Sequence, residues 1–277
     1  MTPPVVLSIA ATDSGGAAGL AADLTTFAAL GVHGACAVTA VTAQDTTAVH
    51  SVIPLAAPDV ARQIDAVLGD LAVAAIKTGV LGSEATAQVV AGVATQNRHI
   101  PLIVDPVLVS TTGGELASDK VLRSYRQIVL PVATVITPNR EEASRLLGGE
   151  GPSVDMARAL HEFGPAVVLT GGHPDGATCT DILVDHSGAL SELAHPAIAT
   201  DNDHGTGCTF SAALAAGLAR GEPLELAVRH AQRFVARAIH ISKTWRLGRG
   251  RGPVAHTQHA AIHNSVTNNS LTNNKEN

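Results

Sequence analysis

Aromatic residues are scarce in this sequence: Phe, Trp and Tyr together make up 2% of its 277 residues. A core without large rings has to be built from Ala, Val, Leu and Ile, and such small side chains suit close packing of helices against a buried sheet. The scarcity therefore argues against an all-β sandwich and favours an α/β fold. The 45% of hydrophobic residues can supply the core of one large domain.

Cysteine is also rare, and its spacing excludes two common kinds of site. Cys36, Cys179 and Cys208 are far apart, odd in number and form no C-x-x-C pair. Neither a disulfide framework nor a zinc site is therefore expected, and a reducing cytoplasm is the compartment that fits this usage.

Excess positive charge and long apolar runs are both absent. The formal net charge is −6, which gives no electrostatic basis for a nucleic-acid partner. No apolar run reaches the roughly 20 residues that cross a bilayer. The opening MTPPVVLSIAATD has no basic segment of the kind that begins a signal peptide. We therefore expect no membrane association and a cytoplasmic location.

Two familiar nucleotide-binding motifs are missing as well. No G-x-x-x-x-G-K-[ST] occurs, and Gly15–Gly19 does not have the glycine spacing of a dinucleotide fingerprint. A Walker-type site and a Rossmann-type dinucleotide site are therefore disfavoured. A G-x-S-x-G nucleophile elbow is also absent.

What the sequence does contain is a regular alternation of short apolar runs and helical patterns. The runs predict buried strands at Val5–Ala10, Ala35–Val41, Ala74–Leu81, Pro101–Val107, Ala133–Thr137 and Ala166–Thr170. Helices are predicted at Ala17–Leu30, Glu84–Thr95, Asp119–Val129, Asp155–Phe163, Cys208–Arg220 and Pro223–Ser242. This alternation predicts an α/β fold with a mostly parallel sheet, helices on both faces, and a site at the carboxyl ends of the strands.

The last third of the chain adds a hairpin and a polar tail. Ile182–Asp185 and Leu190–Ala194, joined by a short turn, predict an antiparallel hairpin at the sheet edge. Residues 257–277 are rich in Asn, Thr and Ser, which predicts a disordered tail. No linker divides the remainder, so residues 1–256 are expected to form a single domain.

The stretch HGTGCTFSAALAAGL, residues 204–218, places two glycines and a cysteine directly before a helix-forming run. Such a turn leaves backbone N–H groups unpaired at the positive end of the helix dipole, which favours an anion there. The same field is expected to lower the pKa of Cys208. Three interpretations stay open: a phosphate cradle, a nucleophilic cysteine, or a tight turn in which Cys208 fills a small space.

Polar residues gather where predicted strands give way to loops. Gln44, Asp105, Asn139 and Thr170 all follow such strands, and Glu142 comes shortly after Asn139. Because the carboxyl ends of parallel strands share one edge, these groups are expected to converge on one cleft. Each has an alternative role: Asn139 fits the N-cap of the helix that carries Glu142, and an Asp before a proline is a common turn element.

Together, several motifs in a fixed order connect the chain with a known family. They are IAATDSGGAAGLAADLTTFAALG, TAVTAQ, KTGVLGS, IVDPVLVST, ITPNREEA, LTGGH, DHGTGCTFSAALAAGLARG and LGRGRGPV. Over about residues 5–256 the chain resembles the hydroxymethylpyrimidine kinase/phosphomethylpyrimidine kinase family of thiamine biosynthesis. That family lies within the ribokinase-like superfamily, which also contains the pyridoxal kinases.

The resemblance implies a three-layer α/β/α ribokinase-like fold. It also implies an enzyme that uses ATP and Mg²⁺ to phosphorylate a small-molecule pyrimidine, hydroxymethylpyrimidine, and then its monophosphate. A homodimer is expected on the same basis.

The resemblance further assigns roles to residues of this chain. It implies that the pyrimidine is held by Asp23 and Gln44, between apolar positions that include Ala11, Val80 and Val107. The anion hole falls to Gly205, Thr206, Gly207 and Cys208, and Cys208 matches the position at which sugar kinases carry a catalytic Asp. With a lowered pKa, Cys208 either acts as the base toward the hydroxymethyl group or contributes to the anion site, and we favour the base. The nucleotide side falls to Asp105, Asn139, Thr170 and Gly172, and the metal to Glu142 and Asp105.

Three departures from the family pattern bear on this assignment. Thr170 stands where the family commonly has lysine, Asp203 stands where it usually has threonine, and Ala11 stands where it usually has glycine. A vitamin B6 kinase is therefore the nearest alternative. A pyrimidine-binding protein without phosphoryl transfer and a cysteine hydrolase built on Cys208 are the others.

Overall fold

The secondary-structure elements follow the predicted alternation of strands and helices. The computed structural model describes residues 2–109, 114, 116–171 and 178–256. The strands are β1 (Val5–Ala10), β2 (His33–Val38), β3 (Ala40–Gln44), β4 (Val49–Pro54), β5 (Val73–Thr78), β6 (Leu102–Val104), β7 (Val135–Ile136), β8 (Ala166–Leu169), β9 (Thr178–Val184) and β10 (Leu190–Pro196). The helices are α1 (Gly19–Ala29), α2 (Ala57–Asp70), α3 (Glu84–Gln96), α4 (Asp119–Ser124), the π-helical turn η1 (Tyr125–Val129), the 3₁₀ turn η2 (Leu130–Val132), α5 (Arg140–Leu147), α6 (Ser153–His161), α7 (Thr206–Ala219) and α8 (Leu224–Ser242).

Eight strands form the central sheet, in the order β10-β9-β8-β7-β6-β5-β1-β2. The pairs from β2 to β8 are parallel, whereas β9 runs antiparallel to both β8 and β10. The predicted parallel sheet with a late antiparallel edge hairpin is therefore confirmed. Because early and late strands share this sheet, we propose that residues 1–256 form a single domain. The predicted tail, residues 257–277, lies outside the described residues.

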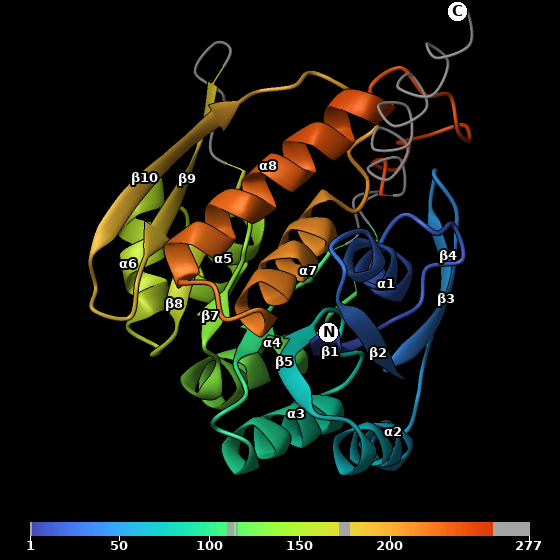
Figure 1. Ribbon diagram of the computed structural model, residues 1–277, viewed down its shortest axis with the longest axis vertical. Helices are drawn as coiled ribbons and strands as arrows, with labels where there is room; N and C mark the ends of the chain where they lie inside the picture. The colour runs from blue at the N-terminus through green and yellow to red at the C-terminus, as the bar shows by residue number, and fades with distance from the viewer. Residues whose placement is uncertain (1, 110–113, 115, 172–177, 257–277) are drawn as a thin grey trace, which may run out of the picture.

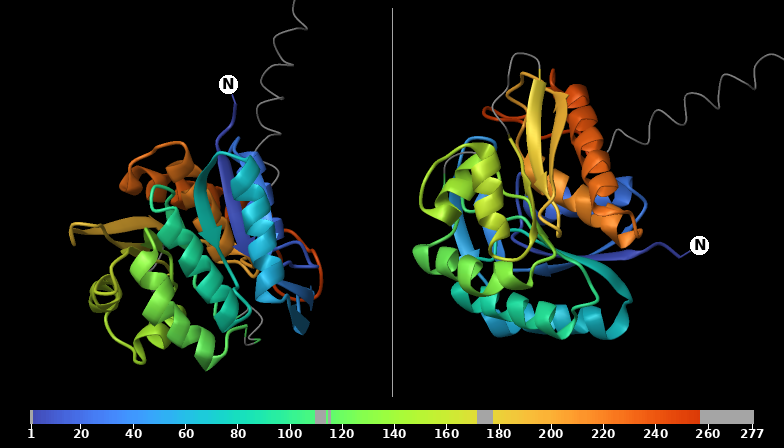
Figure 2. Two further views of the ribbon diagram at one scale, coloured as in Figure 1. Left: turned by 90° about the horizontal axis from the view of Figure 1, so that it is seen from below. Right: turned by 90° about the vertical axis from the view of Figure 1, so that its left-hand side faces the viewer.

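Helices cover both faces of the sheet and give the predicted three layers (Figures 1 and 2). Helices α1, α7 and α8 pack on one face, where Phe27, Leu214 and Val228 belong to one buried cluster. Helices α2, α3, α5 and α6 and the turn η1 pack on the other face, around a second cluster that includes Ile64 and Val90. Among the described residues, no helix is both long and apolar enough to cross a membrane.

Helix α7 is the most enclosed of the helices that lie against the site. Its residues from Cys208 to Gly217 are all buried, so it has no solvent-facing side over that length. Most of them are small, which lets α8 and α1 approach α7 closely. This packing explains how a core with few aromatic rings is filled.

Two predicted elements differ in the structure. The predicted strand Ala35–Val41 breaks at Thr39, and the chain continues as β3 into a separate two-stranded antiparallel sheet with β4. Thr39 is fixed at this bend because its N–H donates to the Ala10 carbonyl at 3.0 Å and its hydroxyl donates to the Val80 carbonyl at 2.6 Å. The predicted helix Asp119–Val129 divides into α4 and η1, and the buried Tyr125 hydroxyl donates to the Gly79 carbonyl at 3.3 Å.

The contact between α7 and α8 gives a stability prediction. A Cβ on Gly217 would lie 2.8 Å from the Ala227 Cβ. We expect Gly217→Ala to lower the free energy of unfolding by about 1–3 kcal/mol, because overpacking outweighs the gain in helix propensity. Gly92→Ala in α3 is the control, because a Cβ there meets nothing within 4 Å. It should raise the free energy of unfolding by about 0.5–1 kcal/mol. Urea unfolding of both variants measures the difference, and an unchanged or more stable Gly217→Ala would contradict this account of the helix contact.

Candidate active site

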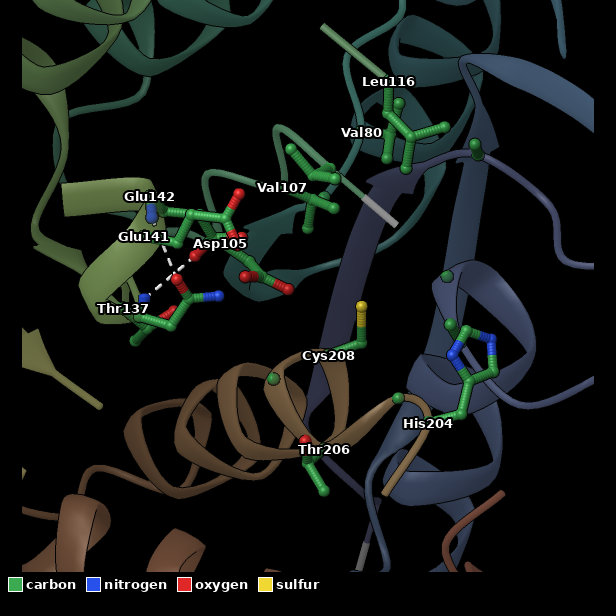
Figure 3. Close-up of a pocket in the computed structure, with 18 of the residues that line it drawn as sticks. Val80, Asp105, Val107, Leu116, Thr137, Glu141, Glu142, His204, Thr206 and Cys208 are labelled. Atoms are coloured by element: carbon green, nitrogen blue, oxygen red, sulfur yellow. Dashed lines mark hydrogen bonds between the residues drawn. The ribbon is translucent and has the colours of Figure 1, made fainter. Parts of the chain in front are cut away.

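A cavity of about 470 Å³ opens at the carboxyl ends of the parallel strands. Loops after β1, β5, β6, β7 and β8 reach it, together with β3 and the beginning of α7 (Figure 3). The predicted convergence of strand ends on one cleft is therefore confirmed. The lining brings together these sequence-predicted residues: Ala11, Gln44, Val80, Asp105, Val107, Asn139, Glu142, Thr170, Gly205, Thr206, Gly207 and Cys208. Gly172 lies outside the described residues.

The beginning of α7 projects into this cavity. Gly205 has φ +83°, and a Cβ there would lie 1.8 Å from the Ala17 carbonyl oxygen, so only glycine fits. Helix α7 starts at Thr206 with no side-chain cap and no acidic residue in its first turn. Its first backbone N–H groups therefore lack protein side-chain acceptors, and the helix dipole adds partial positive charge. This geometry matches the phosphate-cradle interpretation of the HGTGC stretch.

Cys208 lies in that first turn, and the prediction that its pKa is lowered is wrong. Burial raises the pKa of the Cys208 thiol well above its ordinary value. The nearby Lys77 ammonium acts in the opposite direction, while Asp105 and Asp23 raise the pKa further. Desolvation therefore outweighs the helix dipole, and the thiol is neutral at rest. The lowered pKa that the sequence suggested is not found.

The predicted role of Asp23 is also wrong. It was expected to contact the pyrimidine, but its side chain is 0% exposed and does not line the cavity. Instead it accepts hydrogen bonds from Lys77 Nζ at 2.9 and 3.0 Å and from Ser8 Oγ at 2.5 Å. The spacing of Leu20, Asp23 and Phe27 along α1 places all three on the buried face, and this periodicity is the signal that could have shown it.

Lys77 links Asp23 to the pocket. Its side chain is 0% exposed, and Nζ lies 3.6 Å from Asp105 Oδ2. Burial opposes the charge of Lys77, but Asp23, Cys208 and Asp105 together outweigh it and raise the pKa of the ammonium group. Asp105 also accepts a hydrogen bond from Ser211 Oγ of α7 at 3.2 Å. A buried chain of ion pairs therefore lies under the pocket floor.

The acidic side of the pocket is organised by the beginning of α5. Glu142 N donates to Asn139 Oδ1 at 2.9 Å, and Asn139 N donates to Glu142 Oε2 at 2.9 Å. This capping box confirms the alternative role of Asn139, which caps the helix and lines the pocket at once. Thr170 is placed beside them, because its N–H donates to the Pro138 carbonyl at 2.9 Å.

Asp105 and Glu142 form a donor set that fits Mg²⁺. Burial, and next the charge of Asp105, raise the pKa of Glu142 well above its ordinary value. A cation between the two carboxylates would relieve that repulsion. The described residues contain no group of three or more His, Cys, Asp and Glu side chains placed to hold a metal. Mg²⁺ commonly takes one or two carboxylates and completes its shell with phosphate oxygens and water, so two carboxylates suffice.

The opposite wall is apolar and suits a small ring. Ala11 and Val80 are buried in one cluster, and Val107 and Leu116 pack against it. Gln44 lies nearby on β3, and its backbone N–H donates to Ser14 Oγ at 2.8 Å. Its side-chain amide makes no hydrogen bond within the described part of the chain, so it can bind a ligand.

Sequence reasoning missed several members of the lining. Thr42 precedes Gln44 by two residues on β3 and therefore shares its face, which strand periodicity could have shown. Arg145 lies one helical turn after Glu141 on α5, and its guanidinium lies 3.2 Å from that carboxylate.

The extra negative charge expected from Asp203 is offset, because Arg251 Nε donates to Asp203 Oδ1 at 2.7 Å.

Comparison with known proteins identifies relatives along nearly the whole chain. The family model described as phosphomethylpyrimidine kinase matches residues 13–255. A hydroxymethylpyrimidine/phosphomethylpyrimidine kinase of Rhizobium meliloti is 44% identical over 260 residues, which are 91% of this chain and 96% of the relative.

Solved structures share the fold. The pyridoxal kinase from Staphylococcus aureus in complex with AMP-PCP has a TM-score of 0.84 and 32% identity, over 95% of this chain and 96% of the other. A phosphomethylpyrimidine kinase from Clostridium difficile has a TM-score of 0.74 and 32% identity, over 85% of this chain and 99% of the other. The ribokinase-like fold that the sequence suggested is therefore confirmed.

The buried ion pairs give a second stability prediction. We expect Lys77→Met to lower the free energy of unfolding by about 3–5 kcal/mol, because Asp23 and Asp105 would keep buried charges without their partner. Arg229→Met is the control: it breaks the exposed pair with Glu225 and should cost less than about 1 kcal/mol. Chemical denaturation measures both, and similar small losses would show that the buried pairs do not support the pocket floor.

Proposed function

The chain belongs to the phosphomethylpyrimidine kinase family, and we propose that its pocket transfers the γ-phosphoryl group of ATP first to hydroxymethylpyrimidine and then to the resulting monophosphate. The enzyme is a phosphotransferase. In the first step the hydroxymethyl oxygen attacks γ-phosphorus and its proton passes to solvent, while the bond to the β-phosphate bridging oxygen breaks and ADP leaves. In the second step an oxygen of the monophosphate makes the same attack and gives a diphosphate.

One observation carries the proposal. The uncapped beginning of α7 faces a cavity that has two carboxylates on one side and an apolar wall on the other. Phosphoryl transfer requires the equatorial oxygens of the transferring group to be held and their charge offset, and preorganised backbone N–H groups do this. We propose that the N–H groups of Gly205, Gly207 and Cys208 supply them here, since the Thr206 N–H already donates to the Asp203 carbonyl at 3.2 Å.

The nucleotide side is assigned to the acidic wall. ATP use follows from the kinase family and agrees with the S. aureus relative, which was solved with the ATP analogue AMP-PCP. We propose that Asn139 and Thr170 contact the nucleotide phosphates and that Asp105 and Glu142 hold Mg²⁺. Bound there, Mg²⁺ would offset the negative charge of the phosphates.

The pyrimidine is assigned to the apolar wall. Ala11, Val80 and Val107 present flat apolar surface to a ring, and the Gln44 amide can both donate to and accept from ring nitrogens and an amino group. Asp23 has no place in this contact. It acts through Lys77, by fixing the floor on which the ring rests.

We also propose that the chain is a homodimer, as its resemblance suggested. Val41 and Ile53 lie opposite each other across the β3–β4 pair and are 46% and 63% exposed. Two neighbouring large apolar side chains on an outer face support burial against a second copy.

ADP release with Mg²⁺-ATP tests the proposed reaction. Hydroxymethylpyrimidine, its monophosphate, pyridoxal and pyridoxine are offered in parallel, and each product is identified by mass. We expect the first to yield a monophosphate and the second a diphosphate. Turnover of pyridoxal alone would assign the protein to vitamin B6 phosphorylation. Pyrimidine binding with no turnover would leave a binding protein.

The role of Cys208 is the sharpest point within this proposal. Because its thiol is neutral at rest, we propose that it contacts the transferring phosphoryl group and does not act as the base that the sequence suggested. We expect Cys208→Ser to keep kcat within about tenfold of the wild type, since serine retains a small hydrogen-bonding group. The exposed Cys36→Ser is the matched control. A loss of roughly 10²–10⁴ in kcat for Cys208→Ser alone would restore the base assignment.

A further inference from the structure

His204 lies immediately before the glycine turn of α7, and its backbone is fixed from two sides. Its N–H donates to the Gly252 carbonyl at 3.0 Å. The next residue, Gly205, packs directly on the Ala17 carbonyl. The side chain is 4% exposed and lines the cavity. The backbone contacts therefore fix where the His204 side chain enters the cavity.

The imidazole lacks the partners that buried nitrogens normally have. Neither Nδ1 nor Nε2 of His204 makes a hydrogen bond within the described part of the chain. Buried polar groups are paired in the great majority of cases, and those that are not call for an explanation. Because the ring lines the cavity, a ligand in that cavity is a partner within its reach.

One charged group stands behind the ring. Asp13 Oδ2 lies 3.6 Å from His204 Nε2, which is an ion-pair distance. Burial opposes ionisation of Asp13, but the contact with His204 and hydrogen bonds from the N–H groups of Gly15, Ala17 and Ala18 outweigh it and lower the pKa of this carboxyl. A carboxylate held in this way can orient the imidazole from behind.

The location of His204 places it on the acceptor side of the reaction. In Figure 3 the acidic side chains of Asp105 and Glu142 lie on one side of Cys208 and His204 lies on the other. Attacking and leaving oxygens lie roughly in line on opposite sides of the transferring phosphorus. With the nucleotide on the acidic side, the attacking oxygen therefore comes from the side of His204.

The second phosphorylation requires the acceptor side of the pocket to bind a negatively charged phosphate group. The first acceptor is a neutral alcohol, whereas the second carries a phosphate monoester. Only two of the described residues in the lining, His204 and Arg145, can carry positive charge. Arg145 is on α5 with the acidic group and lies 3.2 Å from Glu141. His204 is thus the basic side chain of the lining that stands apart from that acidic group.

From these contacts we propose that His204, oriented by Asp13, binds the phosphate of the monoester acceptor and so makes the second phosphorylation possible. This inference rests on the proposed kinase function and adds to it a residue that discriminates between the two acceptors. The imidazole donates an N–H to a non-attacking phosphate oxygen. No covalent bond to His204 forms or breaks.

The test compares the two acceptors in the purified full chain carrying His204→Gln. Glutamine keeps a neutral N–H donor but removes the imidazole that Asp13 orients. We expect kcat/KM for the monophosphate to fall about 10- to 100-fold, as loss of a charge-assisted hydrogen bond implies. The loss should appear mainly in KM, and kcat/KM for hydroxymethylpyrimidine should change less than about threefold. His230→Gln on α8 is the matched control, since His230 is paired with Glu222 outside the pocket and should affect neither acceptor.

Equal losses for the two acceptors, or none, would overturn the inference and leave the kinase assignment intact. If the wild type phosphorylates neither pyrimidine, the proposed function fails. Calorimetry then measures how tightly the wild type and His204→Gln bind the monophosphate and the alcohol. A variant that binds the monophosphate more weakly than the wild type, and the alcohol equally well, supports the phosphate site. Equal binding of the monophosphate by the two proteins refutes it. If His204→Gln melts far below the wild type, the inference is tested by NMR on the histidine ring resonances of the wild-type protein. One of them should shift with the monophosphate and not with the alcohol, and the absence of such a shift would contradict the inference.

Discussion

The buried ammonium group of Lys77 is the interaction on which the pocket depends. It joins α1 through Asp23 and the loop after β6 through Asp105, while Ser211 extends the contact to α7. Three elements that are distant in sequence are thereby held at one point under the substrate floor. Burying these charges costs desolvation energy, so the chain of ion pairs adds little net stability. What it provides is a fixed relation between Asp105, the proposed metal ligand, and the turn at the beginning of α7, the proposed anion site.

The sequence predicts the layers of this fold well because each signal behind them is local. Apolar runs of strand length, separated by helical periodicity, require a covered parallel sheet whatever the details of packing. The break at Thr39 could not be predicted in that way. It depends on hydrogen bonds to Ala10 and to Val80, residues that the chain brings close only after folding. The same holds for the π-helical turn at Tyr125, whose hydroxyl is held by Gly79.

In the candidate site too, the sequence predicts the positions of residues better than their chemistry. Glycines before a helix, and polar residues after strands, mark positions that topology alone brings together, and the cavity contains nearly all of them. The chemistry of individual groups is different, because it depends on neighbours in space. The pKa of Cys208 is set by burial and by Lys77, Asp105 and Asp23, not by its place in a motif. The burial of Asp23 was available from helical spacing, but its partner was not.

The charge balance of the pocket explains how an acidic protein handles anionic substrates. In the proposed assignment, Mg²⁺ held by Asp105 and Glu142 would offset the charge of these side chains and of the nucleotide phosphates on that side. Asp203 adds no further repulsion, because Arg251 pairs with it. On the other side the apolar wall and the N–H groups of α7 carry no negative charge. The proposed donor and acceptor sides therefore differ in charge before any substrate binds. Thr170 is placed beside Asn139 by its own backbone, and we propose that Mg²⁺ held by Asp105 and Glu142 would supply the charge that a lysine would supply there.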